Sequence, residues 1–307
     1  MESRININVE RENQFSVLKE SFHNAPYKLT HYGAPRAQPH LEMIIMSASP
    51  GIMDGDRLTI NVNVKREAHM KLYTQSFNKL HPMKNGAFQD TIVNLNENSI
   101  LHYIPHPVTP FKDSIFKAEN KIEMDTSSTL IWGDILGAGR IYMNEAFLFN
   151  KVHMRTTLYR NKQLIFTDNQ CLKTADQPVR DMLFFEGYTH QATFIYSSPF
   201  ATGMKGEMDE ILAGEYDDIS FGFTDAGENT ILLRALGNDG ELLYSFLSML
   251  GQMCWEYTQH QQSLVVPVAG LENSEQNDAQ QIEEALPARK KKTVTAAAKK
   301  QKRSTAA

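Results

Sequence analysis

Apolar and polar residues alternate along much of this chain, most regularly within residues 41 to 76. Leu58, Ile60, Val62 and Val64 are separated from one another by single polar residues. A period of two predicts a β-strand that turns one face into a core. An apolar strand and a glycine turn precede it, and a third strand with a polar end follows it.

The glycine turn before this strand carries two acids. Gly51 and Gly55 lie on either side of Asp54, and Asp56 follows at once. Glycine adopts backbone angles that are closed to other residues. The sequence therefore predicts a tight turn that presents Asp54 and Asp56 at the edge of a strand.

Short strand-like runs also occur before and after this stretch, with glycine and polar residues between them. They cover residues 4–9, 27–32, 88–95, 99–104, 115–124, 129–135 and 147–159. This spacing is typical of an all-β domain. A sandwich, a barrel and a β-solenoid all stay open, and no repeat of fixed length marks a solenoid.

Helical periodicity predicts two helices near the C-terminal end. The first covers residues 204–213, with Met208, Ile211 and Leu212 on one apolar side and Gly214 to end it. The second covers residues 239–257, with Asp239 as its N-cap. The apolar stripe of the second helix consists of Leu243, Phe246, Leu247, Leu250 and Cys254.

Composition changes after about residue 270, where Glu, Gln, Asn, Ala and Lys dominate. Such a segment buries too little apolar surface to offset chain entropy. We therefore predict a β-rich domain over residues 1–270 and a disordered basic tail over residues 271–307. Residues 1–288 carry 23 basic and 36 acidic side chains. This acidic body disfavours nucleic acid as the main partner.

The two cysteines, Cys171 and Cys254, lie far apart and form no CxxC pair, which indicates a reducing compartment. The N-terminal residues are charged and lack an apolar signal core. The longest apolar stretch, residues 242–255, is too short and too often interrupted by polar residues to span a bilayer. We expect a soluble cytoplasmic protein with no membrane contact.

Motifs for catalysis and for tight metal binding are missing. The chain has no GxSxG, HExxH, GxxxxGK[ST] or GxGxxG motif. His102 and His106 lie close enough in sequence to share a metal ion, but neither a cysteine nor an acid stands beside them. The pattern predicts no tight structural metal site there.

Asp134 lies within the apolar run LIWGDIL. A buried charge without a partner is very costly, so this carboxylate needs one. One hypothesis is an ion pair with Arg57 or Arg140. The other is an internal polar path, lined also by the hydroxyls of Thr74 and Ser76. Such a path would bind a divalent cation weakly and let it pass.

Four segments together resemble a known family. They are SPGIMDGDRL (49–58), LYTQSFNKLHPM (72–83), LHYIPHPVTPFKDS (101–114) and IWGDILGAGR (131–140). Their order and spacing resemble those of the urease accessory protein UreD, called UreH in some bacteria, and the resemblance covers roughly residues 5–260. Asp54 departs from the family pattern, which often has glycine at this position.

The resemblance implies a mainly β protein with a β-helical, solenoid-like body of many short strands and two C-terminal α-helices. It also implies a urease maturation chaperone without catalytic activity. Such a chaperone binds UreF, which recruits the GTPase UreG, and the assembly docks on apo-urease. Nickel would pass transiently through the protein, with no tightly bound cofactor. The residues that match polar positions of the family motifs, and that are our candidates for the nickel path, are Asp56, Thr74, Ser76, Asp134 and Glu145.

Two other functions remain open from the residues alone. Asp56 and Asp134 would be the acid–base pair of a hydrolase if both faced one pocket. His102 and His106 would bind metal in a storage protein.

Overall fold

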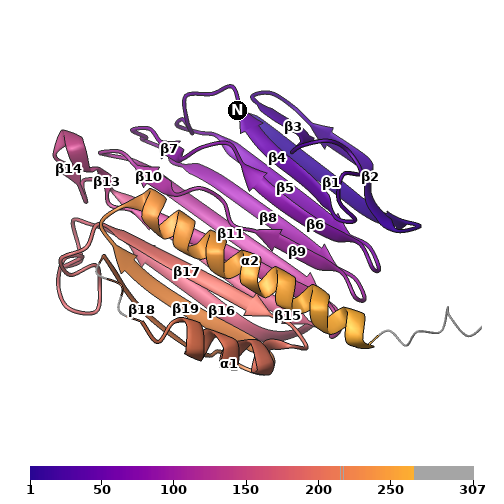
Figure 1. The fold of residues 1–307 in the computed structure, drawn as a ribbon. Coiled ribbons are helices and arrows are strands. Elements are labelled where there is room, and N and C mark those ends of the chain that lie inside the picture. The colour runs from indigo at the N-terminus through magenta and orange to yellow at the C-terminus, as the bar shows by residue number, and fades with distance from the viewer. Residues whose placement is uncertain (215, 217, 266–307) are drawn as a thin grey trace, which may run out of the picture. The chain divides into compact units, whose positions relative to one another are not determined.

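The computed structural model of the chain describes residues 1–214, 216 and 218–265, and most of its strands belong to two large β-sheets (Figure 1). Chain contacts separate Met1–Gln261 from Gln262–Ala307. The described part of the second unit is the end of a helix, and the architecture below is that of the first unit. The predicted tail, residues 271–307, lies outside the described residues.

Sheet A has seven strands in the order β16-β15-β11-β8-β5-β1-β2. Its strands are β1 (Glu2–Glu12), β2 (Phe15–His23), β5 (Arg57–Val64), β8 (Ala87–Leu95), β11 (Ile115–Met124), β15 (Lys151–Arg160) and β16 (Gln163–Leu172). The five inner strands pair in parallel, and β2 and β16 pair antiparallel at the two edges.

Sheet B has the strand order β18-β19-β17-β12-β9-β6-β4-β3, with short strands β7 and β10 beside this path. Its strands are β3 (Tyr27–His31), β4 (Leu41–Ser47), β6 (His69–Thr74), β7 (Asn78–Leu80), β9 (Ile100–Tyr103), β10 (Val108–Pro110), β12 (Thr129–Gly137), β17 (His190–Ser197), β18 (Ile219–Asp225) and β19 (Thr230–Gly237). A separate small hairpin consists of β13 (Gly139–Arg140), the 3-10 turn η1 (Ile141–Met143) and β14 (Glu145–Ala146).

Between β5 and β15 the chain alternates between the two sheets, and each coil stacks in parallel on the one before it. Asn63 and Asn94, which pair in register, are 31 residues apart. This spacing between paired positions of successive coils, the coil offset, is 29 residues for the next coil and 36 for the one after it. These unequal coils confirm the predicted β-helical body and explain why the sequence shows no fixed repeat.

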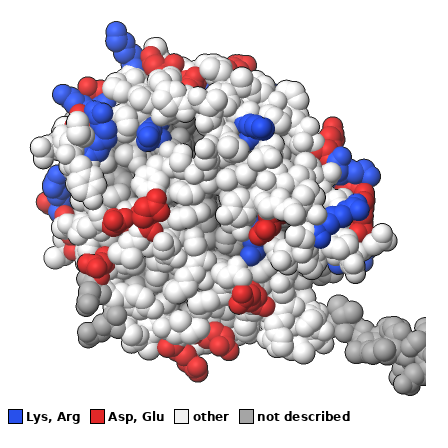
Figure 2. All heavy atoms as spheres, turned by 45° about the horizontal axis from the view of Figure 1, so that its top comes forward, with Lys and Arg blue, Asp and Glu red and all other residues white. Residues whose placement is uncertain are grey.

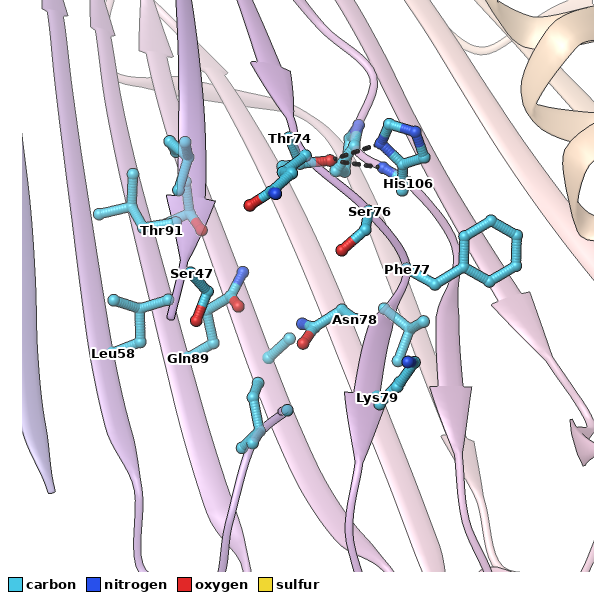
Figure 3. Close-up of a pocket in the computed structure, with 18 of the residues that line it drawn as sticks. Ser47, Leu58, Thr74, Ser76, Phe77, Asn78, Lys79, Gln89, Thr91 and His106 are labelled. Carbon is cyan, nitrogen blue, oxygen red and sulfur yellow. Dashed lines mark hydrogen bonds between the residues drawn. The ribbon is translucent and has the colours of Figure 1, made fainter. Parts of the chain in front are cut away.

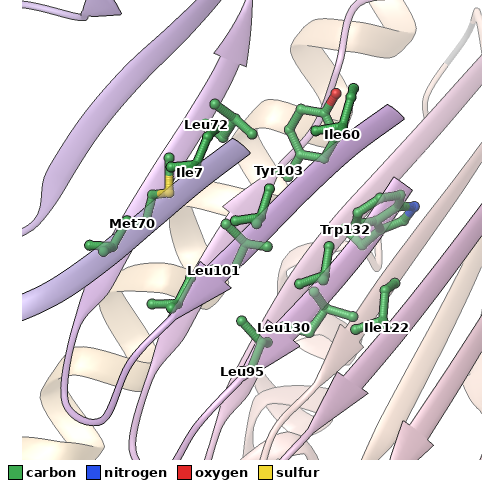
Figure 4. Packing of buried hydrophobic residues seen from close by; sticks show 14 of the residues in the cluster. Ile7, Ile60, Met70, Leu72, Leu95, Leu101, Tyr103, Ile122, Leu130 and Trp132 are labelled. Atoms are coloured by element: carbon green, nitrogen blue, oxygen red, sulfur yellow. The ribbon is translucent and has the colours of Figure 1, made fainter. Parts of the chain in front are cut away.

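The inner faces of the two sheets form one apolar core. The predicted alternation of strand β5 is confirmed, since Leu58, Ile60, Val62 and Val64 are all buried. Sheet B contributes Tyr103 and Trp132, whose rings meet edge to face with centroids 5.2 Å apart. Figure 4 shows these rings among the aliphatic side chains of both sheets.

The outer face of sheet A is polar where β1, β5 and β8 lie side by side. The Asn61 amide donates to Asn6, and the Asn63 amide donates to Asn8, at 2.8 Å each. The Asn94 amide donates in turn to Asn63 at 2.7 Å. These bonds stack amides from successive coils, which satisfies polar groups on a partly covered surface.

Helices α1 (Ala201–Ile211) and α2 (Gly240–Val265) pack on the outer face of sheet B, as Figure 1 shows for α2. Asp239 is confirmed as the N-cap of α2, because its Oδ1 accepts the backbone N–H groups of Glu241 and Leu242 at 2.7 and 3.2 Å. The apolar stripe predicted for α2 is buried. Of the residues predicted for the apolar side of the first helix, Met208 and Leu212 are buried, but Ile211 is 47% exposed.

Helix α2 lies very close to sheet B at Gly251. A Cβ atom added there would lie 2.5 Å from His102 Nε2 and 2.7 Å from Ile104 Cδ1. Gly206, on the exposed side of α1, has no such atom within 4 Å. The two helical glycines therefore differ in their surroundings and not in their secondary structure.

We predict that Gly251→Ala and Gly206→Ala change stability in opposite directions. Alanine favours a helix by about 1 kcal/mol over glycine, which is the gain expected for Gly206→Ala. In Gly251→Ala the clash with His102 and Ile104 is expected to outweigh this gain and to destabilise the protein by about 1–2 kcal/mol. Urea unfolding of the full chain measures both effects, and stabilisation by both variants would contradict the close packing of α2.

Candidate functional site: an internal polar cavity

A cavity of about 230 Å³ lies between sheets A and B. Strands β5, β8, β11 and β15 line it from sheet A, and β6, β7, β9 and β12 line it from sheet B. The segment that follows β4, residues 47–52, also contributes to its wall. The stacked coils thus leave a partly open space that is large enough for several water molecules.

Polar side chains line one end of the cavity. Figure 3 shows Ser47, Ser76, Asn78 and Gln89 turned toward one another, while the ring of Phe77 points away. These hydroxyl and amide groups come from β4, from β8 and from the chain between β6 and the end of β7. They offer oxygen ligands and hydrogen bonds without a fixed charge.

Thr74 and His106 form a fixed pair on the wall of the cavity. The Thr74 hydroxyl accepts the backbone N–H of His106 at 2.8 Å and shares a second hydrogen bond with its Nδ1 at 2.9 Å (Figure 3). The His106 ring stacks on Tyr244 of α2, with centroids 4.2 Å apart. Burial lowers the pKa of His106 from its ordinary value.

Asp134 also lines the cavity and is the only carboxylate among the described residues that do so. Its Oδ2 accepts the indole N–H of Trp132 at 2.7 Å, and the Thr156 hydroxyl also bonds to it. Burial raises the pKa of this carboxyl to about 7, against the opposing effects of Trp132 and Arg234. Asp134 is therefore close to half ionised near neutral pH.

The partners expected for Asp134 from the sequence are wrong. Arg57 lies over the ring of Phe88, with its Cζ 4.5 Å from the ring centroid. Arg140 forms an ion pair with Glu145 at 2.7 Å. Neither guanidinium reaches Asp134, which has Trp132 and Thr156 as its hydrogen-bond donors instead.

Two residues of sheet A that the sequence did not single out also face the cavity. Thr91 and Asn120 pair in register on β8 and β11. Thr91 is 1% exposed, and its hydroxyl has no hydrogen-bond partner among the described residues. A buried hydroxyl without a partner is costly, so a molecule or ion that enters the cavity gains a bond here.

The structure brings together only some of the candidate residues for the nickel path. Thr74, Ser76 and Asp134 line the cavity. Asp56 lies in the turn before β5, where it binds the N-terminal amine at 2.9 Å. Burial, and then the charge of Asp56, raises the pKa of Tyr27 to about 12. Because Tyr27 lines the cavity, Asp56 lies near the cavity wall. Glu145 lies apart, on the small hairpin.

The two alternative functions lack their sites in the described part of the chain. Asp56 does not line the cavity that holds Asp134, so these carboxylates do not face one pocket. His102 is buried against Trp255 of α2, with ring centroids 6.4 Å apart, whereas His106 bonds to Thr74. No three His, Cys, Asp or Glu side chains of the described residues are grouped to hold a metal ion.

On the face drawn in Figure 2, Lys and Arg side chains are scattered among acids and a broad uncharged area. They form no continuous basic patch among the residues coloured there, which is in line with the acidic body predicted from the sequence. No helix within the described ranges has the length and apolar character needed to cross a membrane.

The fold and its cavity define a mainly β protein with a polar space between its two sheets and two helices on one face. The sequence model of a family described as "UreD urease accessory protein" matches residues 1–266. The chain therefore belongs to the UreD family of urease accessory proteins, and it has a role in urease maturation.

Individual relatives agree with this assignment. The urease accessory protein UreD of Flavobacterium johnsoniae is 33% identical over 78% of this chain and 87% of its own length. That of Acetivibrio thermocellus is also 33% identical, over 81% of this chain and 95% of its own length. The urease accessory protein UreH of Helicobacter pylori is 28% identical over 74% of this chain and 84% of its own length.

We predict that Asp134→Asn stabilises the protein in a pH-dependent way. The pKa is about 7 in the folded state and near the ordinary value of 3.8 when unfolded. Ionised Asp134 therefore destabilises the fold increasingly as pH rises from about 4 to 7. Asparagine removes this cost, so the free energy of unfolding should increase by up to about 4 kcal/mol at pH 8 and little at pH 4.

Urea unfolding at the two pH values measures this difference. Asp225→Asn is the matched control, because Asp225 is exposed and pairs with Lys205 on the surface. An equal effect of Asp134→Asn at both pH values would contradict the raised pKa and point to altered packing instead.

Proposed function

We propose that this protein is a cytoplasmic urease maturation chaperone that passes Ni²⁺ toward the urease active site and performs no chemistry of its own. It binds a UreF-like protein, supports the complex of UreF with a UreG-like GTPase, and brings that complex to apo-urease. Membership of the UreD family supports the role in maturation. The cavity between the sheets supports the passage of a cation.

The observation that carries the proposal is Asp134, the lone carboxylate among the described residues of a cavity lined by hydroxyl, amide and apolar groups together with the exposed Lys79. Oxygen donors attract a divalent cation, and one carboxylate adds the charge that draws it from water. A site that holds Ni²⁺ tightly needs several strong ligands in fixed geometry. Thr74, Ser76, Thr91 and Asp134 supply a weaker set, from which the ion can leave again.

The remaining candidates have lesser roles in this proposal. Asp56 is engaged by the N-terminal amine, and Glu145 is neutralised by Arg140. Asp56 lies near the wall of the cavity, where it can attract a cation to the protein. Glu145 lies on a hairpin outside the cavity and is expected to contribute least.

The proposed partnership is tested by co-purification. A tagged full-length chain should retain a UreF-like protein, and through it a UreG-like GTPase, from cells that express the urease system. Deletion of this chain should leave urease with little nickel, measured by metal analysis of the purified enzyme. A normal nickel content in its absence would contradict the proposal.

We predict that Asp134→Asn lowers the rate of urease activation about tenfold, because loss of the buried charge removes at least about 1.4 kcal/mol of attraction for the cation. In the wild type the rate should fall as pH drops below 7, since Asp134 then becomes protonated. Activation is run at each pH and urease is assayed afterwards at one fixed pH.

Two controls accompany this experiment. Asp225→Asn removes an exposed carboxylate outside the cavity and should leave activation unchanged. Co-purification of Asp134→Asn with its partners separates a defect in passage from a defect in assembly. Full activation by an Asp134→Asn protein that assembles normally would show that the cavity is not the route.

A further inference from the structure

A row of polar side chains crosses the inner face of sheet A. Thr91, Asn120, Thr156 and Asp168 lie in register on β8, β11, β15 and β16. The Asn120 amide donates to the Thr156 hydroxyl at 2.9 Å. This row starts at the cavity and continues past it, through an otherwise apolar sandwich, to the edge strand β16.

A second polar row crosses the inner face of sheet B. Asp134, Thr193 and Arg234 lie in register on β12, β17 and β19. Arg234 Nη1 donates to the Thr193 hydroxyl at 3.1 Å, and Nη2 forms an ion pair with Asp168 of sheet A at 2.8 Å. The two rows therefore start near each other at the cavity and meet again at this ion pair.

The ion pair stands between the interior and a surface cleft. Arg234 lines a cleft of about 600 Å³, together with Gln170 and Gln191. The Arg234 side chain is 36% exposed and that of Asp168 is 18% exposed, and Asp134, which lines the cavity, is partly buried. The polar rows thus lead from the cavity to a second place on the surface.

We infer that the passage has a second opening at this cleft and that the Asp168–Arg234 ion pair is its gate. This inference rests on the proposed function, because it takes the cavity to be a cation route. In the closed state the guanidinium fills the opening and its positive charge opposes a cation. Asp168 holds the guanidinium in place and offsets part of its charge.

The alternative is that the ion pair only joins the edges of the two sheets. The two functions make different demands on single variants. Loss of either partner would weaken a purely structural link in the same direction. Loss of the positive partner opens a gate, whereas loss of the negative partner leaves an unbalanced positive charge on the route.

Trp132 provides a reporter for cations that arrive at Asp134, since its indole donates to that carboxylate. The chain has two tryptophans, so Trp255→Phe leaves Trp132 as the only one. In this full-length background, Ni²⁺ is added by rapid mixing and the rate of fluorescence quenching is recorded. If Trp255→Phe does not fold, quenching is recorded in the native chain instead. The part of that quenching which Asp134→Asn abolishes then reports the arrival of the cation.

We expect Arg234→Gln to speed quenching about tenfold and Asp168→Asn to slow it by a similar factor, as the loss of a nearby unit charge predicts. The double variant should return close to the parent rate. Lys205→Gln, in the surface ion pair with Asp225, should leave the rate unchanged. Circular dichroism of each variant checks the fold.

The outcomes separate the gate from the route. If quenching in the parent protein does not depend on Asp134, the proposed cation route is wrong, and the gate with it. The gate alone would be wrong in two cases. In the first, quenching depends on Asp134 but neither Arg234→Gln nor Asp168→Asn alters its rate. In the second, both variants alter the rate in the same direction. Opposite changes, with recovery in the double variant, support the gate.

Discussion

The parallel register of successive coils is the constraint on which the rest of this structure depends. Because each coil places its strands directly on those of the coil before, a residue position repeats as a row across the sandwich. One row of aliphatic side chains, formed by Val62, Val93 and Ile122, belongs to the core. Where Thr91, Asn120 and Thr156 occupy one such row, the same stacking produces a polar line through the interior.

Polar groups inside an apolar core cost free energy of folding, because they lose their hydrogen bonds to water. In this protein several neighbouring groups offset that cost for Asp134. Asp134 is partly buried, and burial raises the pKa of its carboxyl to about 7, because the interior disfavours the charged form. Hydrogen bonds from Trp132 and Thr156, with the charge of Arg234 nearby, make the ionised form accessible near neutral pH. The proposed attraction of a cation depends on this ionised form of Asp134.

The sequence predicts the local elements well and the contacts between coils poorly. Alternation gave strand β5 and the apolar stripe of α2, and family motifs pointed to Thr74, Ser76 and Asp134. The strand predicted over residues 147–159 begins only at Lys151, because residues 147–150 loop into a separate apolar cluster. The polar rows were missed because coil offsets of 31, 29 and 36 residues hide which positions share a row.

The longest coil has a consequence for how this scaffold can vary. The chain between β12 and β15 leaves the two large sheets to form the β13–β14 hairpin and then returns, yet β15 still stacks on β11 in full register. Residues added at this corner thus project outward and do not shift the strands that follow. Tyr142 at the tip of the hairpin is almost fully exposed. The corner is a natural position for a reporter domain, or for evolution to lengthen the protein, while the interior stays the same.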